Sequence, residues 1–158
     1  MDKVRIGIIG LGNIGQVHVN NILEGKVPRG ELTAVADAFA DKLPEFAAKG
    51  LKTYDNAADL INSGEIDALM ICTPHYQHTT LGSKGLEAGL HVMVEMPLPA
   101  HKADAERLIA VAEKYSARIV VGVFLTCLEL PYSALCQFNH CHDPSARIPL
   151  SYLLCSRP

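Results

Sequence analysis

Long apolar stretches and runs of basic residues are both missing from this chain of 158 residues. The apolar segment at its start is short and includes Arg5, so it fits neither a signal peptide nor a membrane span. A net charge of −3 without basic clusters argues against binding to nucleic acid or to an anionic membrane surface. We therefore expect a cytoplasmic protein whose partners are small molecules or other proteins.

Glycine and lysine are missing from the last part of the chain. All 12 glycines lie at or before Gly122, whereas four of the five cysteines follow it. An odd number of cysteines without a secretory signal indicates reduced thiols rather than a disulfide framework. The change in composition divides the chain into a folded domain, residues 1–124, and an atypical, irregular tail, residues 125–158, which we expect to be poorly ordered.

The tail contains a cluster of potential zinc ligands, namely Cys136, His140, Cys141 and His142. Their spacing matches no standard paired-ligand pattern, and adjacent residues do not easily converge on a tetrahedral ion. We therefore expect no metal site.

The most informative motif is Gly-x-Gly-x-x-Gly at residues 10–15, directly after an apolar run. Gly10 permits a tight turn, Gly12 lets the backbone approach a pyrophosphate, and Gly15 lets the next helix lie close to the strand. Asn13 and Ile14 begin that helix, whose free N–H groups and dipole attract phosphate. The motif predicts a dinucleotide site, although three glycines can also serve a turn alone.

An acidic residue at the end of a second strand supports the dinucleotide hypothesis. Residues 31–37 alternate as a strand should and end at Asp37, about 20 residues after the glycines. Its carboxylate can accept hydrogen bonds from the adenosine ribose hydroxyls, and it would repel the 2′-phosphate of NADP. Because Ala38 and Phe39 offer no guanidinium to compensate, NAD is favoured over NADP. The alternative is that Asp37 is an ordinary polar residue at a strand end.

Strand-like and helix-like segments alternate strictly up to residue 123. This order predicts an α/β fold with a doubly wound parallel sheet of about six strands, the Rossmann fold, covered by helices on both faces. The expected strands are residues 4–10, 31–37, 51–54, 66–72, 91–95 and 118–123.

Local signals predict the bounds of several helices. Pro44 fits the first turn of a helix closed by Gly50, and Asp55 is expected to cap a short helix that Gly64 ends. In the helix expected over residues 101–115, one apolar face is predicted to lie in the core: Leu108, Val111, Ala112 and Tyr115.

Two further segments complete a pattern that resembles the Gfo/Idh/MocA oxidoreductases. Residues 71–78 carry Thr-Pro with a histidine four residues after the proline, and residues 88–97 read Ala-Gly-x-His-Val followed by Glu-x-Pro. His18, three residues after the last glycine of the loop, also matches a histidine that is common in this family. The resemblance covers residues 3–124.

This resemblance implies a two-domain enzyme with an N-terminal Rossmann domain that holds NAD(P) and a C-terminal α/β domain that supplies most substrate contacts. Typical members oxidise or reduce a sugar, an inositol or a related polyol. The resemblance also implies that Cys72, Thr73 and Pro74 line the nicotinamide half of the cofactor. Glu95, followed by Pro97, is implied to reach the nicotinamide ribose.

Cysteine and histidine near the fourth strand leave alternatives open. Cys72 is either a small buried hydrophobe or, with a lowered pKa, a nucleophile. His75 is either a general base or a loop histidine bonded to backbone, and the resemblance implies that His78 orders the loop.

The chain departs from the family pattern in two places. Met96 stands where the family has a lysine, and a thioether cannot donate the hydrogen bonds that assist proton transfer. For Met96 itself we expect an apolar residue that packs beside a strand end. After Phe124 the family's catalytic domain has no counterpart, which suggests a shifted reading frame, an alternative transcript end or a cloning artefact.

These observations predict the NAD(P)-binding domain of an oxidoreductase that acts by hydride transfer on a sugar, inositol or related polyol. We expect this chain to bind NAD with little or no turnover and to use a substrate only if a C-terminal domain is supplied. The alternative is a non-enzymatic nucleotide-binding regulator or sensor that binds a protein partner, which the loss of the family lysine favours. The surface on which a second domain would pack predicts self-association into homo-oligomers.

Overall fold

The computed structural model describes residues 3–96, 102–115 and 119–121. Within these residues the chain forms a six-stranded sheet in the order β3-β2-β1-β4-β5-β6, and every neighbouring pair is parallel. The strands are β1 (Val4–Ile9), β2 (Gly30–Ala36), β3 (Lys52–Tyr54), β4 (Ala68–Ile71), β5 (His91–Val94) and β6 (Ile119–Val121). The predicted α/β fold with a doubly wound sheet is confirmed, and this strand order is that of the Rossmann fold.

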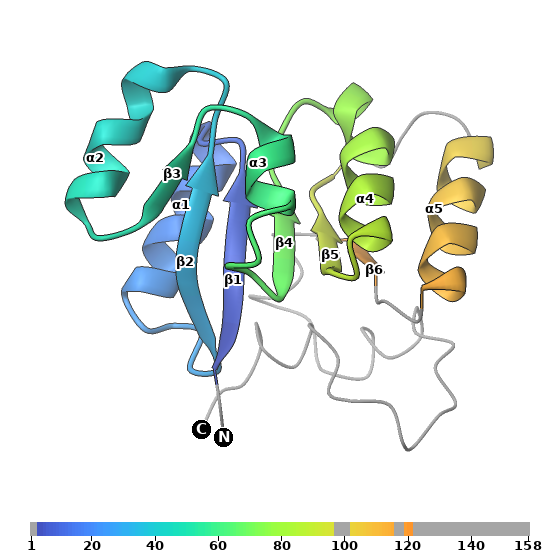
Figure 1. The fold of residues 1–158 in the computed structure, drawn as a ribbon, viewed down its shortest axis with the longest axis horizontal. Coiled ribbons are helices and arrows are strands. Elements are labelled where there is room, and N and C mark those ends of the chain that lie inside the picture. Colours follow the sequence, from blue (N-terminus) through green and yellow to red (C-terminus); the bar gives the residue numbers. More distant parts are fainter. Residues whose placement is uncertain (1–2, 97–101, 116–118, 122–158) are drawn as a thin grey trace.

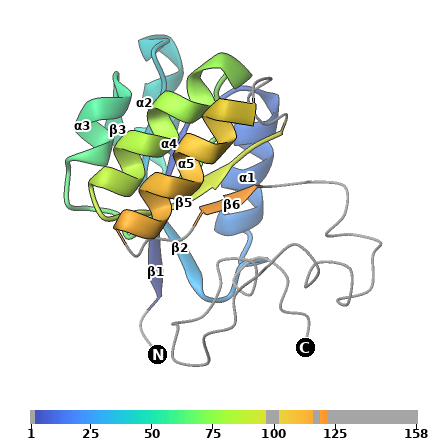
Figure 2. The same ribbon diagram turned by 90° about the vertical axis from the view of Figure 1, so that its right-hand side faces the viewer.

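Helices cover both faces of the sheet. They are α1 (Asn13–Leu23), α2 (Leu43–Ala48), α3 (Ala57–Ile61), α4 (His78–Glu87) and α5 (Lys102–Lys114), with 3₁₀ turns η1 (Ala40–Lys42) and η2 (His75–Gln77). Figures 1 and 2 show α3, α4 and α5 on one face, with α4 beside α5, and α1 on the other face. In the strand order, the direction of winding reverses between β1 and β4. Open α/β sheets bind ligands at the carboxyl ends of the strands at such a point.

Two apolar clusters separate the helices from the sheet. In one, Val19 and Ile22 of α1 and Phe46 of α2 pack against β1 and β2. In the other, Leu86 of α4 and Leu108 of α5 pack against β4 and β5. Because side chains of the central strands are buried on both faces, these strands read as continuous apolar runs in the sequence.

Some local predictions were wrong. Asn56, not Asp55, caps α3, because the Asn56 side chain accepts a hydrogen bond from the Asp59 amide at 2.9 Å. Tyr115 lies just past the end of α5 and is 41% exposed, so it does not join the core face of that helix. The Lys114 ammonium lies 5.0 Å from the centre of its ring.

Other predictions fall partly or wholly outside the described residues. These include the tail of residues 125–158, its cluster of cysteine and histidine residues, and Pro97. In the part of the chain that the structure describes, no group of three or more His, Cys, Asp or Glu side chains is arranged to hold a metal ion. No helix among the described residues is long and apolar enough to cross a lipid bilayer.

Candidate functional site

The glycine loop joins β1 to α1 and packs tightly against the end of β4. Gly10 has φ +93°, and a Cβ there would lie 2.8 Å from the carbonyl carbon and oxygen of Cys72. A Cβ on Gly15 would lie 1.9 Å from the carbonyl oxygen of Gly10. Both glycines are therefore required by the fold, since backbone atoms occupy the space that a side chain needs.

Gly12 differs from its two neighbours in the motif. Its φ of −74° and ψ of −169° are open to any residue, and a Cβ would meet no protein atom within 4 Å. It is exposed, and nothing in the described fold demands a glycine there. No protein atom occupies the space beside Gly12, so the lack of a side chain there fits a backbone that a ligand approaches closely.

Helix α1 begins at this loop without a capping side chain. Gly12 is its N-cap, no side chain accepts a hydrogen bond from the first turn, and that turn contains no acidic residue. The amides of Asn13 and Ile14 therefore lie at an N-terminus that is free to receive an anion. The buried side of α1 is Gly15, His18, Val19 and Ile22, which orients this N-terminus toward the ends of the strands.

Asp37 lies directly after β2 and is 7% exposed. Its Oδ2 accepts a hydrogen bond from the Leu11 amide at 2.6 Å, and its Oδ1 accepts one from the Phe39 amide at 2.9 Å. Burial by itself raises the pKa of Asp37, but the two amide donors and the nearby charge of Lys42 outweigh burial and hold the pKa below its ordinary value. A carboxylate thus stands beside the glycine loop and fixes one of its amides.

Sequence reasoning missed Lys42. Its Nζ lies 3.4 Å from Oδ2 of Asp37, although only Ala38 and Phe39 were considered as sources of a compensating group. The available signal was the spacing of five residues, because one 3₁₀ turn, η1, brings such a residue back to the acid.

The Thr-Pro segment follows β4 and lies against the loop. A Cβ on Gly10 would lie 2.9 Å from the amide nitrogen of Thr73 as well as against Cys72, so the two predicted segments lie side by side. His78 at the start of α4 is 1% exposed, and its Nε2 donates to the Thr73 carbonyl at 2.8 Å. Pro74 is exposed and precedes η2, and His75 is also exposed.

Cys72 is a buried thiol with 8% exposure. Burial, and secondly the charge of Glu95, raises the pKa of Cys72 above its usual range. A thiolate is therefore disfavoured, and of the two alternatives the structure supports the small buried hydrophobe.

Glu95 and His18 form a buried pair at the end of β5. Nε2 of His18 and Oε1 of Glu95 are 2.6 Å apart, and the two residues are 7% and 6% exposed. The other carboxylate oxygen of Glu95 accepts from the Met96 amide at 3.2 Å. The pair ties α1 to the turn after β5, a link that the sequence alone did not indicate.

Met96 does not pack beside the strand end as expected. Its side chain is 49% exposed, and it lies two residues past the end of β5. At this end of the sheet the structure gathers the glycine loop, Asp37, the Thr-Pro segment and Glu95. This arrangement offers free amides to an anion, a carboxylate to hydroxyl groups and close backbone to a flat ligand.

Comparisons with known proteins agree with this geometry. The model of the Gfo/Idh/MocA family, an oxidoreductase family with an NAD-binding Rossmann fold, matches residues 4–123. The chain belongs to this family. The family's domain binds NAD, so the predicted cofactor is confirmed.

Relatives in the family are about one-third identical to this chain over the residues that align. The rhizopine catabolism protein MocA of Rhizobium meliloti is 34% identical over 122 residues, which are 77% of this chain and 38% of that protein. Myo-inositol 2-dehydrogenase of Thermotoga maritima is 33% identical over 121 residues, which are 75% of this chain and 36% of that protein. The chain thus spans well under half the length of these relatives.

Solved structures share the fold. A probable dehydrogenase from Thermotoga maritima matches with a TM-score of 0.74 and 32% identity, covering 78% of this chain and 37% of its own. The WlbA dehydrogenase of Bordetella pertussis, solved in complex with NADH and UDP-GlcNAcA, matches with a TM-score of 0.71 and 27% identity, covering 76% and 37%. The similarity therefore lies within the N-terminal Rossmann domain that the structure describes.

Proposed function

We propose that this chain is the cofactor-binding part of an NAD-dependent oxidoreductase and that by itself it binds the cofactor with little or no turnover. The observation that carries the proposal is Gly12, where φ, ψ and the surrounding space all permit a side chain and none is present. The pyrophosphate of a dinucleotide fits this position, because it needs close approach to backbone amides.

The other residues of the site have proposed roles along the cofactor. The amides of Asn13 and Ile14 hold the pyrophosphate, and Asp37 accepts from the adenosine ribose while staying bonded to the loop. Thr73 and Pro74, with Cys72 beneath them, line the nicotinamide half, held by His78. The nicotinamide supplies the hydride chemistry when it is bound, and the protein orients it and surrounds it with fixed polar groups.

At the nicotinamide end, the contacts of Glu95 limit the role that we propose for it. Both of its oxygens have protein partners, His18 and the Met96 amide, so we propose that it holds the turn after β5 in place and reaches the ribose only from that fixed position. Pro97, in the same motif, is proposed to restrict the backbone conformation after Glu95, because its ring fixes φ.

The proposed substrate class is a sugar, an inositol or a related polyol, oxidised at a hydroxyl-bearing carbon. It follows from relatives named as inositol dehydrogenases and from a neighbour solved with UDP-GlcNAcA. Met96 cannot donate a proton or a hydrogen bond from its thioether, so turnover requires groups from a further domain. The free thiol of Cys72 fits the proposed cytoplasmic location, where thiols stay reduced.

Substitution of Gly12 tests the proposal. Gly12→Ala should leave the free energy of unfolding within about 0.5 kcal/mol of the original, while NADH binding, measured by calorimetry, weakens at least tenfold, about 1.4 kcal/mol. Gly12→Val should weaken binding further. Asn20→Ala, at an exposed position of the same helix, is the control and should change neither quantity.

Two outcomes would reject the proposal. One is the absence of heat and thermal stabilisation with millimolar NADH, and the other is unaltered NADH binding by both Gly12 variants. Loss of folding in Gly12→Ala would contradict the structural premise instead, since no protein atom obstructs the added Cβ.

A second candidate function is a non-enzymatic regulator that senses the cofactor and binds a protein partner. The exposed side chain of Met96 at the family's lysine position favours it. In a chain extended with a family-type C-terminal domain, Met96→Lys should confer NAD-linked polyol oxidation if the enzyme is the ancestral function. Partner binding that persists without any activity would favour the regulator.

A further inference from the structure

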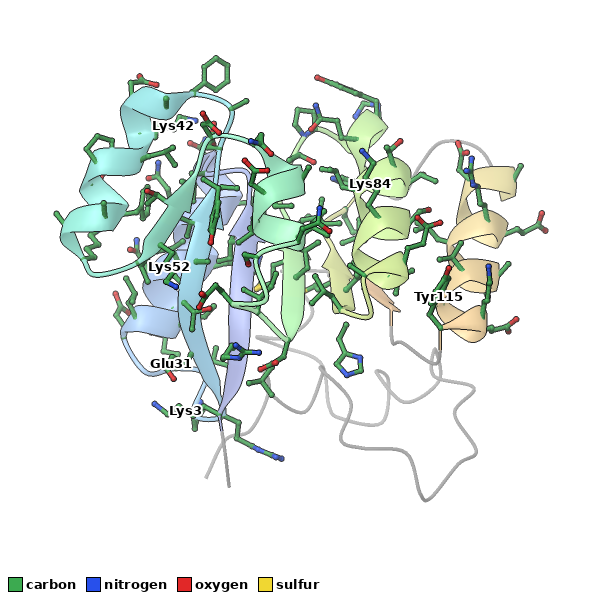
Figure 3. All side chains as sticks on the ribbon, viewed as in Figure 1. Lys3, Glu31, Lys42, Lys52, Lys84 and Tyr115 are labelled. Carbon is green, nitrogen blue, oxygen red and sulfur yellow. The ribbon has the colours of Figure 1, made fainter. Side chains whose placement is uncertain are left out.

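Lys42 stands at the adenosine end of the proposed cofactor site. It is the last residue of η1, and its Nζ is 3.4 Å from Oδ2 of Asp37. Figure 3 shows Lys42 at the end of the sheet toward which the strand arrows point, with Lys3 and Glu31 at the opposite end. The ammonium is therefore beside the position at which the adenosine ribose is proposed to lie.

The ring of Phe39 supports the Lys42 side chain. Nζ of Lys42 lies 5.1 Å from the centre of this ring, within the range of a cation–π contact. The Lys42 side chain is 34% exposed and Phe39 is 68% exposed, so neither side chain is buried in the core. A cation is held there on a short, local structure rather than swinging freely in solvent.

Asp37 and Lys42 differ in how much freedom they keep. The carboxylate is buried, and both of its oxygens accept from backbone amides, so it cannot turn away from the site. The ammonium has three donor hydrogens and is partly exposed, so it can serve a second acceptor without leaving Asp37. The charges of the two groups cancel, but only the Lys42 ammonium can move to donate to another acceptor.

NADP differs from NAD at this point of the molecule. Its 2′-phosphate, on the ribose that Asp37 is proposed to bind, carries a charge of about −1.5 to −2. A lone carboxylate would repel that phosphate strongly, whereas an ammonium attracts it and donates to its oxygens. The balance between Asp37 and Lys42 therefore decides how far NADP is excluded.

Resting on the proposed function, we propose that Lys42 is a cofactor-specificity residue. It offsets the charge of Asp37, keeps the discrimination against NADP moderate, and becomes a ligand of the 2′-phosphate when the charge of Asp37 is removed. NAD, which has no phosphate there, is bound without its help.

Binding of NADH and NADPH, followed by the fluorescence of the reduced nicotinamide, tests this in the original chain and in four variants. Lys42→Met should weaken NADPH binding by about three- to tenfold and leave NADH within about twofold, as expected for one partly exposed charge contact. Asp37→Asn should raise the affinity for NADPH relative to NADH. The double variant with Lys42→Met should lose that gain.

The matched control is Lys49→Met. Lys49 also has its Nζ 5.1 Å from an aromatic ring, that of Phe46, and is paired with an acid, Glu45, yet it lies at the far end of α2. This variant should change neither affinity. If NADPH binds the original chain too weakly to measure, the comparison of Asp37→Asn with the double variant decides.

The possible failures can be told apart. Equal effects of Lys42→Met on NADH and NADPH, or an Asp37→Asn gain that survives the loss of Lys42, would overturn the role of Lys42 and leave the dinucleotide site intact. Failure of the original chain and of every variant to bind either cofactor would overturn both proposals.

Discussion

The strands of this parallel sheet all begin at one edge, the amino edge, and all end at the other, the carboxyl edge. The two edges use acidic residues in opposite ways. At the amino edge, Asp67 precedes β4 and pairs with the side chain of Arg5 at 2.7 Å, and both side chains are 44% exposed. At the carboxyl edge, Asp37 is 7% exposed and accepts hydrogen bonds from the amide of Leu11 in the glycine loop and from the amide of Phe39, two residues further along the chain. The pKa of both carboxyls is lowered, in Asp67 chiefly by the hydrogen bond from Arg5 and in Asp37 by amide donors that overcome burial.

This difference separates surface pairing from construction of a site. An exposed ion pair contributes little to stability, because water and salt screen it and two long side chains must be ordered. A buried carboxylate that accepts amides instead fixes the path of the backbone. At the carboxyl edge Asp37 accepts from the Leu11 amide of the glycine loop and Glu95 accepts from the Met96 amide after β5, so buried acids there hold the backbone beside the proposed site.

The strongest way to disrupt the carboxyl edge is Gly15→Ala. The new Cβ would lie 1.9 Å from the carbonyl oxygen of Gly10, and backbone cannot move aside cheaply. We expect the free energy of unfolding to fall by about 3 kcal/mol, measured by urea denaturation.

Gly85→Ala is the matched control for this prediction. Gly85 is also a helical glycine that packs on the sheet, but its Cβ would meet the side-chain ends of Leu69 and Val92 at 2.9 and 3.0 Å. Only side-chain atoms would have to shift, and alanine favours a helix over glycine by up to about 1 kcal/mol, so the loss of stability should be about 1–2 kcal/mol smaller than that of Gly15→Ala. Equal losses in the two variants would contradict the argument that backbone contact makes Gly15 necessary.

Much of the fold could be predicted from the sequence because its signals are local and repeated. The apolar runs of the central strands and the glycine motif predicted β1, α1 and their junction. Strict alternation predicted the parallel sheet and its doubly wound order. The errors arose where neighbouring residues compete, as at Asp55 and Asn56, because both residue types cap helices and only the backbone decides between them.

The side-chain partners within the site could not be predicted in the same way. His18 and Glu95 are 77 residues apart in the sequence, and their contact depends on how α1 lies across the sheet. Lys42 reaches Asp37 only because the residues after β2 form a 3₁₀ turn. The sequence placed Asp37 and Glu95 at the ends of expected strands, whereas tertiary packing and the local turn determined which side chains they meet.

Removal of His18 tests whether the second buried acid also supports the carboxyl edge. His18→Leu should lower the free energy of unfolding by about 2–3 kcal/mol, because it takes a partner from a buried carboxylate. His75→Leu, at an exposed position of the nearby turn, should change stability by less than about 0.5 kcal/mol. Urea denaturation measures both.

A double variant separates the pairing from simple loss of packing. His18→Leu with Glu95→Leu should lose less stability than the two single variants added together, since no buried acid is then left without its partner. Additive losses would show that His18 and Glu95 are not energetically coupled, and the claim that this buried pair supports the carboxyl edge would then be wrong.

The smallest effects are expected for Asp37→Asn and Asp67→Asn, whose losses in the free energy of unfolding can be compared directly. The folded pKa of each carboxyl lies below its unfolded value of about 3.9, so its stabilising contribution is complete above that pH and is lost as the pH falls through the folded pKa. Asp37→Asn should cost about 1–2 kcal/mol at pH 7, because the amide nitrogen of asparagine would face a backbone donor. Asp67→Asn should cost less. Both differences from the original chain should shrink below about pH 4.

Salt then distinguishes the two acids. The amides that hold Asp37 carry no net charge, whereas Asp67 depends on the guanidinium of Arg5 at an exposed position. At about 1 M salt, where the screening length is about 3 Å, the cost of Asp67→Asn should largely disappear while that of Asp37→Asn should largely remain. Equal salt sensitivity would mean that Asp37 is stabilised mainly by Lys42, and the carboxyl edge would then be held by the same surface pairing as the amino edge.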